Sequence, residues 1–433
     1  MSSNIKKLVK RTSLAIGVAA LATGAAISHA ADTIKVGVLH SLSGTMAISE
    51  TTLKDTVLMM IEEQNKAGGV LGKKLEAVVV DPASNWPLFA EKTKQLLSKD
   101  KVSVIFGCWT SVSRKSVLPV IEELNGLLFY PVQYEGEESS KNVFYTGAAP
   151  NQQAIPAVDY LMSAEGVKRW VLEGTDYVYP RTTNKILEQY LISKGVKKED
   201  ISINYTPFGH SDWQTRVAEI KKFGSAGKKT AVVSTINGDA NVPFYKELGN
   251  AGITAEDIPV VAFSVGEEEL SGFDTKPLVG HLAAWNYFMS AEAPENDAFI
   301  AMWHKFIKNT KRPTNDPMEA TYIGFKMWVK AVEKAGTTDV DPVREAMYGV
   351  TVPNLTGGIA VMNTNHHLTK PVLIGEIQED GQFEIVWETA GGVIGDAWTD
   401  FLPESAVLVA DWTKPISCGN FNIKTGKCSG QNY

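Results

Sequence analysis

Short runs of β-branched and other apolar residues alternate with longer amphipathic segments along most of this chain, and this alternation restricts the fold more than any other feature. The first cycle opens with the run Ile34–Leu39 and continues into a segment that places Leu53, Val57 and Met60 on one helical face. Strands that alternate with helices form parallel sheets covered by helices on both faces. The pattern therefore predicts an α/β protein.

A second series of cycles follows Asn151, with strand-like runs at 169–173, 201–205, 230–235 and 260–263. Two successive series predict two doubly wound lobes with parallel sheets, joined by short hinge crossovers. About 400 residues also exceed what one hydrophobic core usually organises. We expect a first lobe of 31–148 plus about 285–370, a second lobe of 149–284 plus about 371–410, and a tail of 411–433.

The last third of the chain departs from this alternation. Aromatic residues recur at helical spacing near 298–309 and 318–335, where they are typical of a buried core. The runs 372–377 and 383–387 flank Asp380 and Gly381, a pair that favours a tight hairpin turn. We expect this hairpin to cover part of one lobe.

The N-terminus has the order of a secretory signal peptide. Lys6, Lys7, Lys10 and Arg11 precede an uncharged stretch from 13 to 27, and Ser28-His29-Ala30 follows as a cleavage site. The pattern predicts removal of residues 1–30 and a periplasmic location, the alternative being an N-terminal helix that stays on the protein. No later run of about 18 apolar residues is present, so no direct membrane insertion is expected after cleavage.

Charge and cysteine content exclude further classes. A formal net charge of −7 gives no reason to expect nucleic acid as a partner. In an oxidising compartment Cys418 and Cys428 are predicted to form a disulfide that closes a tail loop, whereas a two-thiolate metal site lacks further ligands nearby. Cys108 has the surroundings of a small buried hydrophobe more than those of a nucleophile.

Loops that follow strands are the expected binding region, because ligands of doubly wound sheets lie outside the carboxyl ends of the strands. Several of these loops are rich in hydroxyls, amides and aromatic rings. The candidate ligand-binding residues are Trp109, Thr110, Ser111, Tyr130 and Val132 from the first half of the chain, and Tyr177, Asn237, Asp239 and Glu267 from the second.

Each candidate also has a simpler interpretation. Ser111 stands where a helix begins, so N-capping alone would explain it. Trp109 would be explained by packing in the core, and Glu267 by membership of a solvated run of carboxylates, Glu267–Glu269. The pair His366-His367 is interpreted as a surface turn. No G-x-S-x-G, H-E-x-x-H, P-loop or G-x-G-x-x-G motif occurs at a strand-to-helix junction, so we predict no enzyme activity, no cofactor and no metal.

Five blocks of sequence in a fixed order carry a family resemblance. With them the chain resembles the type I periplasmic solute-binding proteins, and within these the urea and short-chain amide branch that serves ABC importers. The blocks are GCWTSVSRKS (107–116), YPVQYEG (130–136), APNQ (149–152), DYVYP (176–180) and STINGD (234–239).

The resemblance implies a Venus-flytrap protein that holds its ligand between two lobes and delivers it to a membrane permease. It implies that Trp109, Ser111, Tyr130 and Val132 face Tyr177, Asn237 and Glu267 across the ligand. An amide-sensing regulator of the same family has Tyr at the position of Trp109 and Thr at that of Val132, which favours urea here over acetamide.

Urea needs donors for its oxygen and acceptors for its N–H groups. From the sequence we expect Ser111 and nearby backbone N–H groups to donate, and Asn237 and Glu267 to accept. The alternatives within the class are a short-chain amide or a branched-chain amino acid. A secreted amide hydrolase that uses Cys108 and Glu267, and a receptor module for a sensor kinase, are the alternatives outside it.

Overall fold

The computed structural model describes residues 33–272, 274–406, 421–422 and 427–428. From Thr33 onward they belong to one compact unit. The predicted signal peptide and Cys418 lie outside the described residues, and only the backbone of Cys428 is described, so the predicted disulfide lies outside them as well.

The first half of the chain forms a five-stranded parallel sheet with strand order β2-β1-β3-β4-β5. β1 has the bounds that the sequence predicts, whereas β5 was not predicted from its three residues. The strands are β1 (Ile34–Leu39), β2 (Leu75–Val80), β3 (Val104–Gly107), β4 (Leu128–Tyr130) and β5 (Val143–Tyr145).

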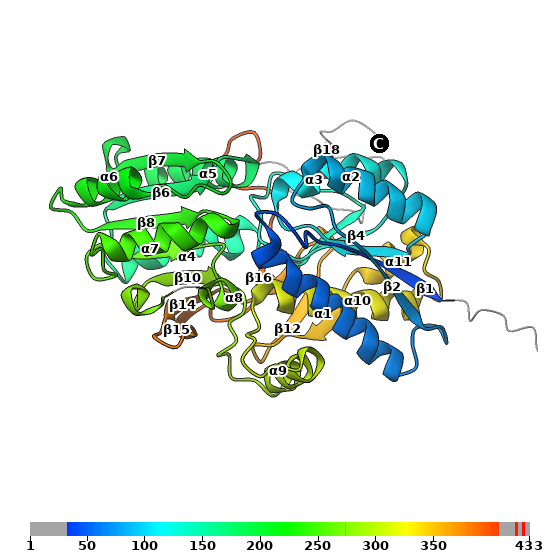
Figure 1. Ribbon diagram of the computed structural model, residues 1–433. Helices are drawn as coiled ribbons and strands as arrows, with labels where there is room; N and C mark the ends of the chain where they lie inside the picture. The colour runs from blue at the N-terminus through cyan, green and yellow to red at the C-terminus, as the bar shows by residue number, and fades with distance from the viewer. Residues whose placement is uncertain (1–32, 273, 407–420, 423–426, 429–433) are drawn as a thin grey trace, which may run out of the picture. The chain divides into compact units, whose positions relative to one another are not determined.

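Helices cover both faces of this sheet, as parallel strands require. α1 packs against α10, and α2 packs against α3. In Figure 1, α2 and α3 lie above the strands and α1 lies below them. The bounds are α1 (Ala47–Lys66), α2 (Trp86–Lys94), α3 (Ser111–Glu123), α9 (Pro294–Ile307), α10 (Asp316–Ala335) and α11 (Val340–Met347).

A seven-stranded sheet follows, with strand order β15-β14-β10-β9-β8-β6-β7. β6 to β10 run parallel, while β14 and β15 form the antiparallel hairpin that the sequence predicts. The strands are β6 (Arg169–Thr175), β7 (Ile201–Thr206), β8 (Thr230–Thr235), β9 (Val260–Ala262), β10 (Leu282–Trp285), β14 (Leu373–Ile377) and β15 (Phe383–Glu388).

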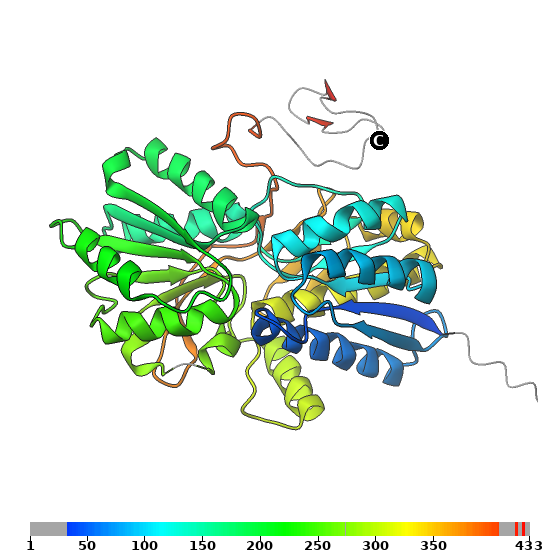
Figure 2. The same cartoon turned by 45° about the horizontal axis from the view of Figure 1, so that its top comes forward.

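This second sheet is buried on both faces because successive residues of a strand point to opposite sides. Val171 and Val232 belong to one apolar cluster, and their neighbours Leu172 and Val233 belong to another. Figure 2 shows helices on either side of these strands. They are α4 (Ala154–Ser163), α5 (Val178–Ser193), α6 (Gln214–Gly224), α7 (Asn241–Asn250) and the short α8 (Glu267–Leu270).

A four-stranded antiparallel sheet follows, with strand order β11-β12-β13-β16, and β17 (Phe421–Asn422) pairs with β18 (Lys427–Cys428) as a separate antiparallel pair. The apolar side chains of the four-stranded sheet, including Ala360 and Leu368, join the core of the five-stranded sheet. The strands are β11 (Thr351–Pro353), β12 (Ile359–Met362), β13 (Leu368–Lys370) and β16 (Val393–Ile394). We call the five-stranded sheet and its core the first lobe, and the seven-stranded sheet and its two cores the second lobe.

The chain passes between the two lobes near Gln152, Asn286 and Pro371, and again between β15 and β16. One side chain connects the first three of these segments. Asn286 follows β10, and its side-chain amide donates to the carbonyl oxygens of Gln152 at 3.0 Å and Pro371 at 2.8 Å. These carbonyls belong to the other two of the three segments. The three segments lie near the boundaries expected at 149, 285 and 371, which remain predictions.

The interpretation of His366-His367 as a surface turn is wrong, since both side chains are fully buried. The backbone carbonyl of His366 accepts from the backbone N–H of Tyr145, which draws the turn against β5. The His367 ring stacks on Tyr145 at 4.9 Å between ring centroids. Burial lowers the pKa of His366 to about 3 and that of His367 to about 4, so both rings are neutral at physiological pH.

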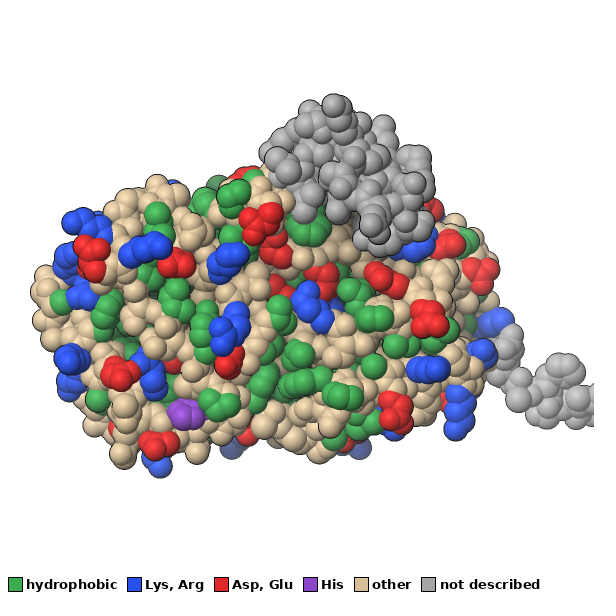
Figure 3. Space-filling model, turned by 90° about the horizontal axis from the view of Figure 1, so that it is seen from above, with side chains coloured by type: hydrophobic (Ala, Val, Ile, Leu, Met, Phe, Trp, Pro, Cys, Tyr) green, Lys and Arg blue, Asp and Glu red, His purple; other side chains and the backbone are tan. Residues whose placement is uncertain are grey.

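Among the described helices, none combines the length and apolar character that crossing a bilayer requires. On the face drawn in Figure 3, basic and acidic side chains are interspersed, and neither sign forms a continuous field.

Candidate functional site

The loop between β3 and α3 is positioned by one residue in an unusual backbone conformation. Cys108 has a φ of 66°, a region that non-glycine residues rarely adopt, and its backbone N–H donates to the carbonyl of Leu39 at 2.9 Å. Its side chain is fully buried, as expected, and burial raises the pKa of the thiol far above its usual value. The thiol is therefore protonated, and the conformation of Cys108 serves to place Trp109.

Thr110, and not Ser111, caps helix α3. The Thr110 hydroxyl oxygen accepts from the backbone N–H of Ser113 at 3.1 Å, so Ser111 is the first residue of the helix proper. The capping interpretation of Ser111 is therefore wrong, because the cap position lies one residue earlier. The hydroxyl of Ser111 is left for other contacts.

Trp109 makes direct contact with the second lobe. Only 2% of this residue is exposed, and its indole N–H donates to the side-chain oxygen of Asn237 at 3.4 Å. Its carbonyl oxygen accepts a hydrogen bond from the hydroxyl of Tyr130, which lies at the end of the neighbouring strand β4. Trp109, Tyr130 and Asn237 are thus brought together as the sequence predicts.

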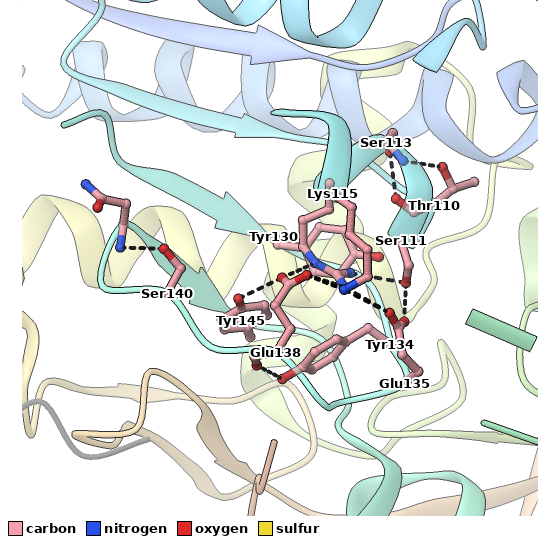
Figure 4. Close-up of polar contacts among 12 residues, drawn as sticks. Thr110, Ser111, Ser113, Lys115, Tyr130, Tyr134, Glu135, Glu138, Ser140 and Tyr145 are labelled. Atoms are coloured by element: carbon pink, nitrogen blue, oxygen red, sulfur yellow. Dashed lines mark hydrogen bonds and ion pairs between the residues drawn. The ribbon is translucent and has the colours of Figure 1, made fainter. Parts of the chain in front are cut away.

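Ser111 is held by two charged neighbours (Figure 4). Its hydroxyl donates to a carboxylate oxygen of Glu135, and Arg114 donates to its oxygen from Nη1 at 3.2 Å. Ser111 and Arg114 lie one helical turn apart, so both side chains emerge on one face of α3. Ser111 was predicted to donate to the ligand, but in the structure its hydroxyl donates to Glu135 instead.

Arg114 is the centre of a buried, charge-balanced cluster. Its Nε donates to Glu138 at 2.7 Å and its Nη2 to Glu135 at 3.3 Å, while Lys115 donates to Glu138 at 2.7 Å. The guanidinium lies 4.6 Å from the ring centroid of Tyr130. Burial alone would raise the pKa of Glu138, but Arg114 and Lys115 outweigh it and lower that pKa to about 2. Two cations therefore face two carboxylates.

The last candidate of the first lobe, Val132, lies in a segment that is held by close backbone packing. Val132 is buried, and a Cβ atom at Gly147 would lie 2.1 Å from the carbonyl carbon of Val132. No side chain fits at Gly147, so the loop after β4 lies directly against the chain that leaves β5. This packing holds the segment between Tyr130 and Glu135 in place.

The second lobe brings Tyr177 towards this group but leaves Asp239 apart from it. Tyr177 lies at the N-cap of α5 with its ring 4.8 Å from that of Phe208, and burial, followed by the nearby Tyr130, raises its pKa. Asp239 has an exposed side chain, and its backbone N–H donates to the carbonyl of Thr45 at 3.3 Å. Asp239 thus contacts the first lobe through its backbone.

Several cross-lobe contacts were missed by sequence reasoning. Gln133 donates to the hydroxyl of Ser264 at 2.7 Å, and Ser49 donates to Glu269 at 2.7 Å. Tyr179 lies beside Gln133 and Ser264. Gln133 and Tyr179 fall inside the sequence blocks that carried the resemblance, so their place after strands could have identified them. Ser49 gave no such signal, because it lies inside helix α1.

Glu267 occupies a different neighbourhood from Trp109 and Ser111. It begins α8, is 2% exposed, and one of its carboxyl oxygens accepts from the backbone N–H of Met289 at 2.6 Å. Burial raises its pKa to about 8, so the group is protonated at neutral pH. The interpretation of Glu267 as part of a solvated run is wrong, because α8 turns it inward.

Replacing Glu267 by Gln is expected to flatten the pH dependence of stability. With a pKa of about 8 when folded and 4.5 when unfolded, the folded state binds more protons between these values. The free energy of unfolding therefore falls as pH rises through this window, by at most about 1.4 kcal/mol per pH unit for one proton. Guanidinium melts at pH 5, 6.5 and 8 measure the slope. An equal slope in Glu267→Gln and in the exposed control Glu295→Gln would contradict the assignment.

Comparison with known proteins places this geometry in a family. Residues 34–404 match the family model described as periplasmic binding protein domain. The chain is 26% identical over 370 residues to a leucine-, isoleucine-, valine-, threonine- and alanine-binding protein of Pseudomonas aeruginosa, a match covering 82% of this chain and 92% of that protein. A limonene hydroxylase of Geobacillus stearothermophilus is 34% identical over 116 residues, but this match spans only 21% of that protein.

Solved structures share the fold. A substrate-binding protein of an amino acid ABC transporter from Pseudomonas fluorescens superposes with a TM-score of 0.73 at 19% identity, covering 85% of this chain and 98% of that chain. A solute-binding protein from Rhodopseudomonas palustris in complex with p-hydroxybenzoic acid superposes with a TM-score of 0.71 at 20% identity, covering 84% and 98%.

Proposed function

Because the chain belongs to the periplasmic binding protein domain family, we propose that it captures urea between its lobes and delivers it to the membrane permease of an ABC-type importer. At the level of the family, the chain is a periplasmic solute-binding protein of the kind that serves ABC transporters. The choice of urea rests on the contacts described above.

The proposal rests on the hydrogen-bonding state of the first-lobe residues around Ser111, which we call the first-lobe wall of the site. The Ser111 and Tyr130 hydroxyls give their hydrogens to Glu135 and to the Trp109 carbonyl. Each oxygen can then only accept further hydrogen bonds. The positive charge of Arg114 is already balanced by carboxylates, so this wall offers no free cation to a carboxylate ligand. Such a wall suits a neutral solute that carries several N–H groups.

The aromatic rings near Ser111 agree with a small planar ligand. The rings of Trp109, Tyr130 and Tyr177 supply flat apolar surfaces. In the first turn of α3 the backbone N–H of Ser113 is already taken by Thr110, so the backbone N–H groups of Ser111 and Val112 are the ones that can donate to the urea oxygen. The near-complete burial of Trp109, Ser111 and Asn237 excludes water, which strengthens each of these hydrogen bonds.

The proposal is tested by isothermal titration calorimetry of the protein that starts at Ala31. Urea is expected to bind with a dissociation constant of about 1 μM or lower, which corresponds to about −8 kcal/mol. The panel includes formamide, acetamide, L-leucine and 4-hydroxybenzoate under the same conditions. A flat urea titration while another compound saturates the protein would refute the assignment.

A branched-chain amino acid is the second candidate, because the Pseudomonas aeruginosa relative is named for leucine, isoleucine and valine. An amino acid needs a cation or hydrogen-bond donors for its carboxylate and a negative partner for its ammonium. In this protein the buried cation nearest to Ser111 is held by Glu135 and Glu138, which weakens that candidate. The leucine arm of the same titration decides between the two.

A further inference from the structure

We propose that Glu135 is a positioning residue that fixes Ser111 as a hydrogen-bond acceptor, so that the site selects solutes carrying N–H groups and rejects carboxylates. The proposal rests on the proposed function, because it places the solute against Ser111. It adds a specificity determinant that does not itself touch the solute. The residues involved are drawn in Figure 4.

The direction of the hydrogen bond between Ser111 and Glu135 follows from chemistry. An ionised carboxylate can only accept, so the Ser111 hydroxyl must donate to it. Arg114 has no acceptor, so its Nη1 must donate to the same hydroxyl oxygen at 3.2 Å. The hydroxyl has one hydrogen and two lone pairs. Its hydrogen and one lone pair are used. The Tyr130 hydroxyl also lies beside Ser111, but it gives its hydrogen to the Trp109 carbonyl, so the remaining lone pair is what Ser111 offers to a solute.

The arrangement is held in place because every partner is buried and bound elsewhere. Glu135 also accepts from Nη2 of Arg114 at 3.3 Å, and Arg114 is bound to Glu138 through Nε at 2.7 Å. Glu138 in turn accepts from the hydroxyl of Tyr145 at 2.9 Å. Glu135 and Arg114 have almost no exposed surface. Rotating the Ser111 hydrogen towards a solute would leave a buried carboxylate oxygen without its donor.

The consequence is a preference between solutes of equal shape. Acetamide and acetate are both small and planar, but acetamide offers N–H groups where acetate offers only oxygens. A lone pair on Ser111 attracts an N–H and repels a carboxylate oxygen. Binding proteins that hold carboxylates need the opposite polarity at such a position, namely a hydroxyl hydrogen or a free cation.

The variant Glu135→Gln reverses this polarity. Arg114 can only donate, so the amide oxygen of Gln must face Arg114. The amide NH₂ of Gln then faces Ser111. The NH₂ donates to the Ser111 oxygen, and the hydroxyl hydrogen is released towards the solute. Calorimetry with urea, acetamide and acetate measures the change.

Glu138→Gln is the matched control. It removes the same charge from the same buried cluster, but the side chain of Glu138 accepts from Arg114, Lys115 and Tyr145 rather than from Ser111. We expect Glu135→Gln to shift the acetamide-to-acetate affinity ratio towards acetate at least about tenfold further than Glu138→Gln does. An equal shift in the two variants would overturn the proposal, because charge alone would explain it.

Ser111→Ala provides a second test that leaves the charged cluster in place. Removing the acceptor should weaken urea and acetamide binding by about tenfold, whereas acetate binding should stay the same or become tighter because a repulsive lone pair is removed; no general loss of structure would do this. An equal loss for all three solutes overturns the proposal even if Glu135→Gln does not fold. If the wild-type protein binds neither urea nor acetamide, the proposed function fails separately, and the same variants are compared on the solute that does bind and its amide or acid analogue.

Discussion

Replacing Trp109 by alanine is expected to weaken urea binding by about 100-fold or more. The indole forms one wall of the proposed site, is 2% exposed, and donates to Asn237 across the lobes. Truncating a buried Trp to Ala removes contacts worth about 3–5 kcal/mol, and every 1.4 kcal/mol is a tenfold change in affinity. Because the hydrogen bond to Asn237 joins the two lobes, the variant loses a contact between the lobes as well as the apolar surface that Trp109 offers to the ligand.

Two controls separate this effect from a loss of folding. Trp109→Phe keeps an aromatic wall but removes the N–H, so we expect a smaller loss of about tenfold. Trp303→Phe changes a buried Trp in the core of the first lobe, and its urea affinity should stay at the wild-type value. Calorimetry and thermal melting are measured on all three variants. A folded Trp109→Ala protein that binds urea within about threefold of wild type would remove Trp109 from the site.

The second large effect is expected on stability, at Lys370. This side chain is 1% exposed and donates to Glu319 at 2.6 Å, with Asp316 4.0 Å away. Burial alone would lower the pKa of Lys370, but the two carboxyls outweigh it and the pKa is raised. Removing one partner of a buried ion pair costs about 3–5 kcal/mol, because the other partner stays buried without compensation. We expect Lys370→Met to lower the free energy of unfolding by that amount.

The measurement uses guanidinium, since urea is the proposed ligand and would stabilise the folded state by binding to it. Lys305→Met, at an exposed position on α9, is the control and should stay within about 0.5 kcal/mol of wild type. Adding Glu319→Leu to Lys370→Met should recover at least half of the loss, because the unpaired carboxyl is then removed as well. No recovery would show that Lys370 acts through packing rather than through its charge.

Lys370 also bears on how the lobes are joined. It ends β13 one residue before the crossing at Pro371, and Asp316 accepts from the backbone N–H of Asn286, whose side chain donates to two of the crossing segments. A buried ion pair and an amide therefore meet where the chain passes between lobes.

The strands and the main helices could be predicted from the sequence because they follow local patterns. The strands Ile34–Leu39 and Thr230–Thr235 have the predicted bounds, and β14 and β15 form the predicted hairpin on either side of the Asp380-Gly381 turn. The short strands β5 and β10 were missed, since three or four apolar residues do not distinguish a strand from a buried loop. They are strands because a neighbouring strand of the sheet already offers free backbone groups to pair with.

The sequence by itself determined that two rounds of strand and helix carry polar loops at the strand ends, and it named Trp109, Ser111, Tyr130, Tyr177 and Asn237 as candidates. Only the tertiary structure decided which way their hydrogen bonds point. Ser111 became an acceptor because Glu135, distant in sequence, takes its hydrogen, and Glu267 became a protonated buried acid because α8 turns it inward. Side-chain identity is local, whereas the direction of a hydrogen bond and the charge of a buried group depend on neighbours that only folding brings within a few ångströms.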